Sequence, residues 1–176
     1  MANLISADFA NNQLCILEYT TSDGEMLSFE DNAFDAEIVL HTYTDKGKII
    51  FDKSITTIGG YAFFDCKNLT SITIPNSVTT IEAGAFQRCS NLTSVTIGNS
   101  VSEIGEFAFK GCNLETIVCY PKIPPKLNNS FDKFDNLIVP TGCEEAYANS
   151  DWGRGDELAT AQAKPAPRRP FMWLPW

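Results

Sequence analysis

Residues 54–76 read SITTIGGYAFFDCKNLTSITIPN, and residues 77–99 read SVTTIEAGAFQRCSNLTSVTIGN. The two stretches are identical at 14 of 23 positions, which is far more than unrelated segments would share. The opening of the unit returns a third time at residues 100–104, after the same interval of 23 residues. Self-similarity at a fixed period is the sequence signature of a repeat architecture. The sequence therefore predicts stacked copies of one structural unit.

Each unit contains an Ile, then Ala-Phe-x-x-Cys, then Leu-x-x-Ile-x-Ile. The first copy supplies Ile58, Ala62, Phe63, Cys66, Leu69, Ile72 and Ile74. The second supplies Ile81, Ala85, Phe86, Cys89, Leu92, Val95 and Ile97. The third supplies Ile104, Ala108, Phe109, Cys112, Leu114, Ile117 and Cys119. The third copy has one residue fewer between Cys112 and Leu114, so we expect a shorter turn there.

The second half of each unit predicts a strand, because apolar and hydroxyl residues alternate and many are β-branched. The Gly, Ala and Phe residues before it predict a tight turn or a single helical turn. A unit with one strand cannot bury its apolar face alone, so the copies must stack strand on strand. We therefore predict an α/β solenoid dominated by strands, in which stacked 23-residue repeats form a parallel sheet.

The flanks of the repeats are degenerate, as expected of units that seal the ends of a solenoid. Ser22-Asp23-Gly24 signals a turn and residues 48–51 a strand. Residues 137–140 predict a last partial rung, and residues 144–148 a short closing helix. We divide the chain into an N-terminal capping region (1–53), three repeats (54–121), a C-terminal cap (122–153) and a mobile tail rich in Pro, Arg and Trp (154–176).

Charge and composition exclude several classes of protein. The chain has 13 Lys and Arg against 22 Asp and Glu, a net charge of -9, which disfavours a nucleic-acid-binding surface. It contains no run of 18 apolar residues that could form a membrane-spanning helix. The first 20 residues contain no Lys or Arg and no continuous apolar segment, so we expect no export signal there and leave the compartment open.

The stretch from Leu69 to Cys89 resembles the BspA-like class of leucine-rich repeats found on the surfaces of host-associated microbes. Residues 11–24 and residues 139–147 with Trp152 are similar to the flanking pieces of the same family. The resemblance covers roughly residues 10–153. It implies a right-handed, curved leucine-rich-repeat solenoid at the cell surface or outside the cell. It also implies adhesion or other binding to extracellular-matrix or host proteins.

The polar positions of the repeat strands form the candidate ligand-binding surface. If the apolar residues point inward, their neighbours point outward together. These neighbours are Ser71, Thr73, Ser94, Thr96, Thr116, Val118 and Tyr120. Small hydroxyls ending in an aromatic ring suit a rigid recognition strip for a protein. Alternatively, the hydroxyls merely solvate a β face. Matching of the Thr rows to an ice lattice is a remote third interpretation, because there are few rungs.

The cysteines favour packing over chemistry. Cys66, Cys89 and Cys112 recur with the repeat, as small apolar residues that fill one niche on successive rungs would do. No Cys-x-x-Cys pair exists, so the spacing of a zinc site is missing, and cross-rung disulfides remain an alternative. Cys119 replaces a strand Ile and is predicted to lie in the core. Cys15 and Cys143 fall in the caps, and the pattern leaves them undecided.

Nothing in the sequence favours an enzyme, a cofactor or a metal site. The chain has a single histidine, His41, without a nucleophile motif around it, and we expect an ordinary surface or cap residue. It contains no Gly-rich phosphate loop and no carboxylates at metal-binding spacing. Glu144 and Glu145 are adjacent carboxylates, but they fall at a predicted helix start, where acidic residues suit the helix dipole.

The tail carries two candidate binding motifs. Arg154-Gly155-Asp156 has the sequence of an integrin-binding tripeptide, although a tripeptide also arises by chance. Residues 164–176 are similar to membrane-active peptides rich in Trp and Pro, or to a polyproline ligand. The alternative is a disordered segment, or one that comes from a fusion or a shifted reading frame. The candidate docking residues are Arg168, Arg169, Phe171, Trp173 and Trp176.

Two functions follow from these observations. The first is a non-catalytic module that binds a protein partner through the strand face, for adhesion to or recognition of extracellular or host proteins. The second is a structural or assembly component, such as a virion or surface-layer part, docked by its tail. The resemblance favours the first, and the lack of an export signal in the opening residues favours the second.

Overall fold

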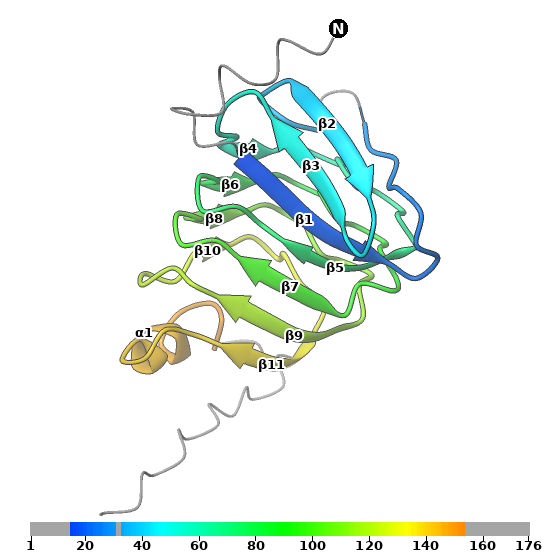
Figure 1. Cartoon of the computed structure of the whole chain (residues 1–176). Helices are drawn as coiled ribbons and strands as arrows, with labels where there is room; N and C mark the ends of the chain where they lie inside the picture. Colours follow the sequence, from blue (N-terminus) through cyan, green and yellow to red (C-terminus); the bar gives the residue numbers. More distant parts are fainter. Residues whose placement is uncertain (1–14, 31–32, 154–176) are drawn as a thin grey trace, which may run out of the picture.

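A computed structural model describes residues 15–30 and 33–153, and in this part of the chain two β-sheets enclose one core (Figure 1). The long sheet has seven strands in the order β11-β9-β7-β5-β1-β3-β2. Its strands are β1 (Cys15–Thr21), β2 (Ile38–Tyr43), β3 (Gly47–Phe51), β5 (Leu69–Thr73), β7 (Ser94–Ile97), β9 (Leu114–Cys119) and β11 (Phe134–Ile138). The short sheet contains β4 (Thr57–Ile58), β6 (Thr80–Ile81), β8 (Glu103–Ile104) and β10 (Lys126–Leu127).

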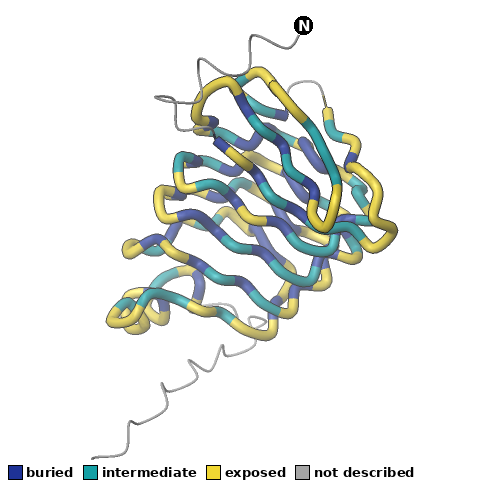
Figure 2. The backbone as a smooth tube through the Cα atoms, in the orientation of Figure 1, coloured by how far each residue is buried: buried dark blue, intermediate teal, exposed yellow. Residues whose placement is uncertain are grey.

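The repeat strands stack in parallel, as the sequence predicts. Ile72 of β5 lies opposite Val95 of β7, which lies opposite Ile117 of β9. From Ser71, Ser94 and Thr116 onward, accessible and buried residues alternate along these strands, so one face of the sheet is in the core and the other meets solvent (Figure 2). The short sheet was not predicted. Its strands are only two residues long, too short for a periodic pattern to reveal.

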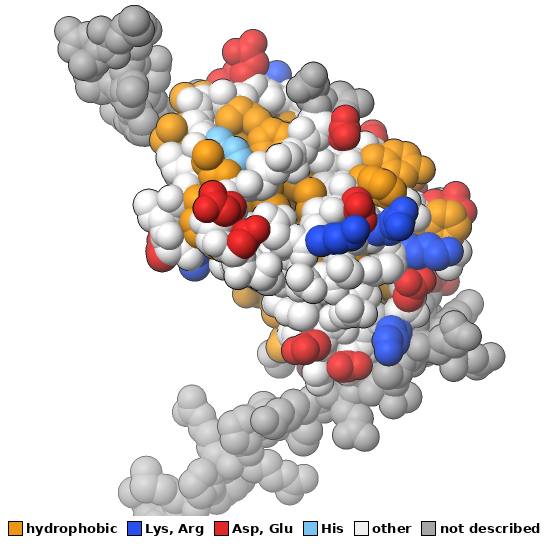
Figure 3. Space-filling model, turned by 90° about the vertical axis from the view of Figure 1, so that its right-hand side faces the viewer, with side chains coloured by type: hydrophobic (Ala, Val, Ile, Leu, Met, Phe, Trp, Pro, Cys, Tyr) orange, Lys and Arg blue, Asp and Glu red, His pale blue; other side chains and the backbone are white. Residues whose placement is uncertain are grey.

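The loops that close each rung share two backbone positions with positive φ. The first is Tyr61 (φ 57), Gly84 (φ 65), Phe107 (φ 58) and Asn129 (φ 52) on successive rungs. The second is Asp65 (φ 58), Arg88 (φ 66) and Gly111 (φ 78). This conformation is favourable for Gly and tolerable for Asn, but uncommon for bulky residues. The loops form one corner of the solenoid, which faces the viewer in Figure 3.

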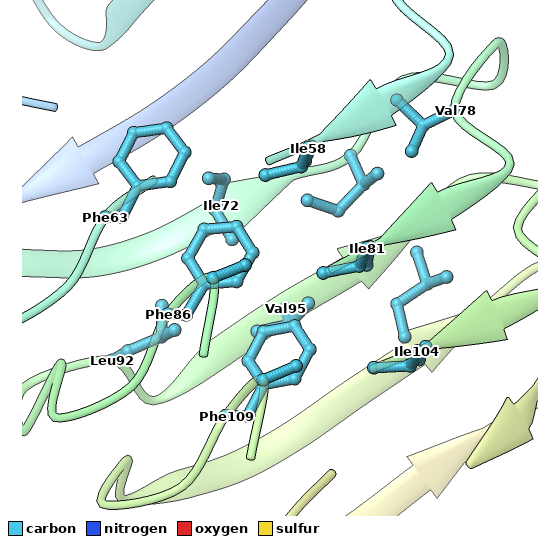
Figure 4. Packing of buried hydrophobic residues seen from close by; sticks show 14 of the residues in the cluster. Ile58, Phe63, Ile72, Val78, Ile81, Phe86, Leu92, Val95, Ile104 and Phe109 are labelled. Carbon is cyan, nitrogen blue, oxygen red and sulfur yellow. The ribbon is translucent and has the colours of Figure 1, made fainter. Parts of the chain in front are cut away.

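A column of phenylalanine rings runs through the core. Phe63, Phe86, Phe109 and Phe131 stack with centroid separations of 5.1, 4.9 and 4.9 Å and interplanar angles of 6°, 10° and 1°. Figure 4 shows the first three of these rings. Such ring pairs contribute about 0.5–1.5 kcal/mol beyond the burial of their area. Phe131 lies in the region predicted as the C-terminal cap, so the column runs one rung beyond the three full repeats.

The cysteines of the repeat are free thiols beside this column. Cys89 and Cys112 are buried and Cys66 is half-buried. Each thiol donates a hydrogen bond to a backbone carbonyl of an earlier segment: Cys66 to Ser28, Cys89 to Phe63 and Cys112 to Phe86. The predicted packing role of Cys89 and Cys112 is confirmed, and so is that of Cys119, which is 1% exposed. Cys15 is also buried, and Cys143 is half-buried.

The N-terminal cap continues the long sheet with reversed polarity. β1 pairs antiparallel with β5 on one side and with β3 on the other, and β2 follows β3 antiparallel. Residues 48–51, which lie in β3, were predicted as a strand, whereas β2 was missed. Its burial pattern shows no alternation, because it lies at the sheet edge. The parallel sheet predicted for the stacked repeats is confirmed, and the N-terminal cap extends it with antiparallel strands.

His41 of β2 belongs to a polar cluster under this cap. Its Nε2 atom lies 2.6 Å from the hydroxyl of Tyr19, which also accepts a hydrogen bond from the Leu27 amide. Tyr19 is 1% exposed, and its ring lies over Gly47. Burial lowers the pKa of His41 from its ordinary value. His41 is thus a cap residue with a structural hydrogen bond.

One carboxylate joins the N-terminal cap to the first repeat. Asp35 accepts hydrogen bonds from the amide and hydroxyl of Thr56 and from the amide of Thr57. Burial alone would raise the pKa of Asp35, but these hydrogen bonds outweigh burial and lower it. The Thr56–Thr57 backbone, where the first strand of the repeat begins, is therefore held by a negative charge.

The C-terminal cap closes the other end of the core. The predicted short helix is confirmed as α1 (Glu144–Ala148). Behind it, Trp152 is 3% exposed, and its indole donates a hydrogen bond to the Pro125 carbonyl. The buried Tyr147 hydroxyl donates to the Pro121 carbonyl. These contacts cover the last phenylalanine of the column, since the Trp152 and Phe131 rings are 5.4 Å apart.

Candidate functional site

The residues predicted to bind a ligand lie in rows across the outer face of the long sheet. Ser71, Ser94 and Thr116 are directly opposite one another on β5, β7 and β9. Thr73, Thr96 and Val118 form the next row. The structure therefore brings together six of the seven predicted residues in two parallel rows, which we call the hydroxyl strip.

The flanking strands lengthen both rows, and sequence reasoning missed their residues. On β1, Thr20 lies opposite Ser71 and Glu18 opposite Thr73. On β11, Asn136 lies opposite Thr116 and Ile138 opposite Val118. The alternation of buried and accessible residues in β1 was a usable signal, but it is interpretable only once β1 is known to pair with β5.

Hydrogen bonds between side chains hold the N-terminal end of the strip. The Thr20 hydroxyl lies 2.7 Å from the hydroxyl of Thr70 and 2.6 Å from that of Ser71. A side chain fixed in this way loses less conformational entropy when a ligand binds. Glu18 forms ion pairs with the ammonium groups of Lys46 at 3.7 Å and Lys48 at 3.6 Å, so its negative charge is compensated.

Tyr120, the seventh predicted residue, lies between two shallow hollows at the end of the strip. One has a volume of about 830 Å³ and is lined by Asn76, Asn99, Ser102, Tyr120, Lys122, Ile123 and neighbouring residues. The other, of about 500 Å³, includes Ile16, Thr73, Thr96 and Tyr120. Tyr120 is 54% exposed and, like Asn76, lines both hollows.

An aliphatic row continues the same sheet face over the N-terminal cap. Leu40 of β2 lies opposite Ile50 of β3, which lies opposite Ile16 of β1. Leu40 is 48% exposed and Ile16 40% exposed. The sheet face therefore presents a row of aliphatic side chains on the strands of the cap, beside the small hydroxyls of the repeat strands. Apolar area beside polar positions is the composition of many protein-binding surfaces.

The described residues offer little that could act as a reactive group. No group of three or more His, Cys, Asp or Glu side chains within residues 15–30 and 33–153 could hold a metal ion. Burial raises the pKa of Cys66 and of Cys119 to about 12, so both thiols are protonated and weakly nucleophilic at neutral pH. In the same part of the chain, no helix is long and apolar enough to cross a membrane.

The predicted motifs of the tail lie outside the described residues. They are Arg154-Gly155-Asp156 and the candidate docking residues Arg168, Arg169, Phe171, Trp173 and Trp176. They remain predictions from the sequence.

A family model described as the BspA type leucine rich repeat region matches residues 9–138 in 6 copies. The chain belongs to the BspA-type leucine-rich-repeat family. The match extends on both sides of residues 54–121, so degenerate units of the BspA-type repeat flank the three full ones. Leucine-rich repeats of this kind form protein-interaction or recognition modules and are generally non-enzymatic.

Among solved structures, the chain is similar to a leucine-rich repeat protein from Bacteroides ovatus, with 22% sequence identity and a TM-score of 0.33. The alignment covers 71% of this chain and 36% of the Bacteroides protein, so the chain spans about a third of that protein's length. The comparison with curated proteins gave no match.

Proposed function

We propose that this BspA-type protein is a non-catalytic binding module that attaches to extracellular or host proteins through the outer face of its long sheet. The observation that carries the proposal is the alignment of the Ser71–Ser94–Thr116 row with the Thr73–Thr96–Val118 row, with the exposed Tyr120 two residues beyond Val118. The two rows form a rigid surface of small polar groups with an aromatic side chain at one end. Exposed Tyr side chains are common anchors in protein interfaces.

The strip itself is narrow, so we propose that the aliphatic row contributes to the same interface. Specific protein interfaces bury about 800 Å² on each partner, and the strip lies on only three short strands. The Leu40–Ile50–Ile16 row extends the available face over the antiparallel strands. A partner covering both regions would bury apolar area over the cap and satisfy hydroxyl groups over the repeats.

The double substitution Thr73→Arg/Thr96→Arg tests this proposal. Both side chains point outward, so two arginines should leave the fold intact and obstruct the strip. Glu103→Arg, at the exposed residue of β8, is the matched control, because it also changes the net charge by two units. We expect the double variant to lose capture of extracellular-matrix and cell-surface proteins at least tenfold, while the control keeps it. Equal capture by both variants would contradict the role of the strip.

The same assay on the full chain and on residues 1–153 distinguishes the alternative function. Capture by both proteins supports recognition through the solenoid and a role in adhesion. Capture by the full chain alone would assign binding to residues 154–176 and favour docking of a structural component. If neither protein captures a partner, the assembly role becomes the better explanation.

A further inference from the structure

Exposed aromatic and basic side chains gather at the loop corner of the repeats, away from the hydroxyl strip (Figure 3). Tyr61 is 53% exposed and Phe64 41% exposed, with ring centroids 5.9 Å apart. The Arg88 guanidinium carbon lies 5.8 Å from the centre of the Phe64 ring. On the next rung, the Lys110 ammonium lies 4.3 Å from the centre of the Phe107 ring. We call these residues and Lys67 the aromatic corner.

The fold of the loops does not require these side chains. Tyr61 and Phe107 occupy the positive-φ position that Gly84 and Asn129 occupy on other rungs, and Arg88 occupies that of Gly111. Bulky residues adopt this conformation at a cost, and such strain concentrates at binding sites. Since Gly occupies the same position on a neighbouring rung, the backbone conformation of the loop does not require Tyr61 or Arg88.

The Tyr61 ring forms a platform on the surface. A Cβ atom added to Gly84 would collide with Cδ1 and Cε1 of Tyr61, so the ring lies across this glycine. Gly84 is buried beneath it, while Tyr61 keeps 53% of its surface exposed. One side of the ring therefore packs against the next rung, and the other side is open to solvent.

Basic side chains lie beside this platform, together with the carboxylates of Asp65, Glu82 and Asp132. The only basic residues between positions 54 and 121 are Lys67, Arg88 and Lys110, which fall on three successive rungs. Asp65 lies among them, 3.4 Å from the Lys67 ammonium and 3.8 Å from Nε of Arg88. The second distance is too long for a hydrogen bond, and Oδ1 of Asp65 has no hydrogen-bond partner within the described ranges. Arg88 therefore contacts Asp65 as a loose ion pair, and its exposed guanidinium can also pair with an anionic group of a ligand.

We propose that the aromatic corner binds an acidic saccharide. The apolar face of a pyranose ring would stack on Tyr61, and a carboxylate or sulfate group would pair with Arg88 between Lys67 and Lys110. Arg forms bidentate hydrogen bonds with such planar anions. The rungs repeat every 4.9–5.1 Å along the phenylalanine column, close to the length of one sugar residue in an extended polysaccharide. An extended acidic peptide presents side chains on one face every ~6.7 Å and fits this spacing less well.

Calorimetric titration of the full chain with three hexasaccharides tests the proposal. The probes are a heparin hexasaccharide, a galacturonate hexamer and the neutral cellohexaose. We expect at least one charged probe to bind more tightly than cellohexaose, with an affinity that falls as salt is added. Preference for heparin identifies sulfate as the anionic group, and preference for galacturonate identifies carboxylate. Absence of binding by both charged probes at millimolar concentration would overturn the proposal.

Tyr61→Gly and Arg88→Gly locate the site, because each installs the residue that another rung carries at the same position. Both variants should fold with an unchanged or higher Tm, and each should lose at least tenfold in affinity for the charged probe. Lys126→Ala, which removes one positive charge from the short sheet, is the control and should bind like the original chain. Undiminished binding by both glycine variants would overturn the proposal. Equal affinity for hexaglutamate would also overturn it, in favour of a peptide-binding surface.

Discussion

At the residue scale, the single histidine makes the stability of the protein depend on pH. The pKa of His41 is lowered by burial from its ordinary value of 6.5, whereas in the unfolded chain it returns to that value. The unfolded chain therefore binds more protons than the folded one just below pH 6.5. In that window the free energy of unfolding decreases as the pH is lowered. Above pH 6.5 the contribution of the neutral imidazole is fully present.

We expect His41→Gln to flatten this dependence. Urea unfolding at pH 7.5 and pH 5.5 measures it as the difference in free energy of unfolding between the two conditions. The original chain should lose more stability on acidification than the variant does. Carboxylates such as Asp35, whose pKa is also lowered, lose their contribution only at more acidic pH, below their ordinary 3.8, and do not interfere. Equal losses in both proteins would contradict this account of His41.

The half-buried thiol of Cys66 gives a second prediction at this scale. Its pKa of about 12 leaves only a small fraction of thiolate at pH 8, so alkylation by iodoacetamide should be about a thousandfold slower than for an exposed cysteine. Between pH 8 and pH 9 the rate of alkylation should rise about tenfold, because both pH values are far below the pKa and the thiolate fraction rises tenfold for each pH unit. Peptide mass spectrometry follows the modification, and glutathione in the same tube is the reference. A rate close to that of glutathione would show that burial does not raise the pKa of the Cys66 thiol.

At the scale of elements, the hairpin of β2 and β3 depends on one glycine. Gly47 is buried, and a Cβ atom there would overlap the ring of Tyr19, which is itself buried. Gly47→Ala should therefore displace Tyr19 and its hydrogen bonds, with a destabilisation of about 1–3 kcal/mol, the usual cost of overpacking. Urea unfolding measures the change, and Lys48→Ala on the same strand is the control.

A double-mutant cycle identifies the cause of that loss. In a Tyr19→Ala background the ring is gone, so Gly47→Ala should cost much less than in the original chain. Additive effects would mean that the glycine matters for its backbone and not for the ring above it.

The same scale shows where sequence reasoning succeeds and where it fails. The strands β5, β7 and β9 were predictable because alternation within the strand and the 23-residue period agree. The short sheet was not, since two-residue strands such as Thr57–Ile58 exist only through pairing with the next rung. β2 was missed because its exposed Ile38, Val39 and Leu40 show no inward and outward alternation.

The two candidate sites also differ in how far the sequence predicts them. The hydroxyl strip follows from strand periodicity, which fixes the side on which Ser71 and Thr73 lie. Its continuation through Thr20 and Asn136 depends on strand order, which a single sequence does not reveal. The aromatic corner was missed altogether, because Tyr61 and Phe64 appear in the sequence as ordinary members of an apolar segment. Only the positive φ of Tyr61 and the position of Arg88 show that they lie together on the surface.

At the scale of the whole molecule, the phenylalanine column should make the rungs unfold together. Phe86 lies in the middle of the column and is fully buried, so Phe86→Ala should cost about 3–5 kcal/mol. That is a large part of the 5–15 kcal/mol that stabilises a typical domain. Loss at one rung should therefore weaken both caps equally.

Two probes test this cooperativity. With Trp173 and Trp176 replaced by Phe, the fluorescence of Trp152 reports on the C-terminal cap, while far-UV circular dichroism reports on all strands. In the parent protein the two signals should change at the same urea concentration. In Phe86→Ala they should again coincide, at a lower urea concentration. Separate transitions would show that the cap and the repeats unfold independently.

The reversed polarity of β1 also bears on how such a chain can change in length during evolution. A new repeat must place a parallel strand beside an existing parallel strand, and β1 offers the sheet an antiparallel neighbour on that side. Duplicated units can therefore be inserted only between β5 and the C-terminal cap. Each insertion would lengthen the molecule by one rung of about 5 Å, given the spacing of the stacked rings, and leave both ends unchanged. The N-terminal cap would therefore stay unchanged, while the number of rungs between it and the C-terminal cap sets the length of the molecule.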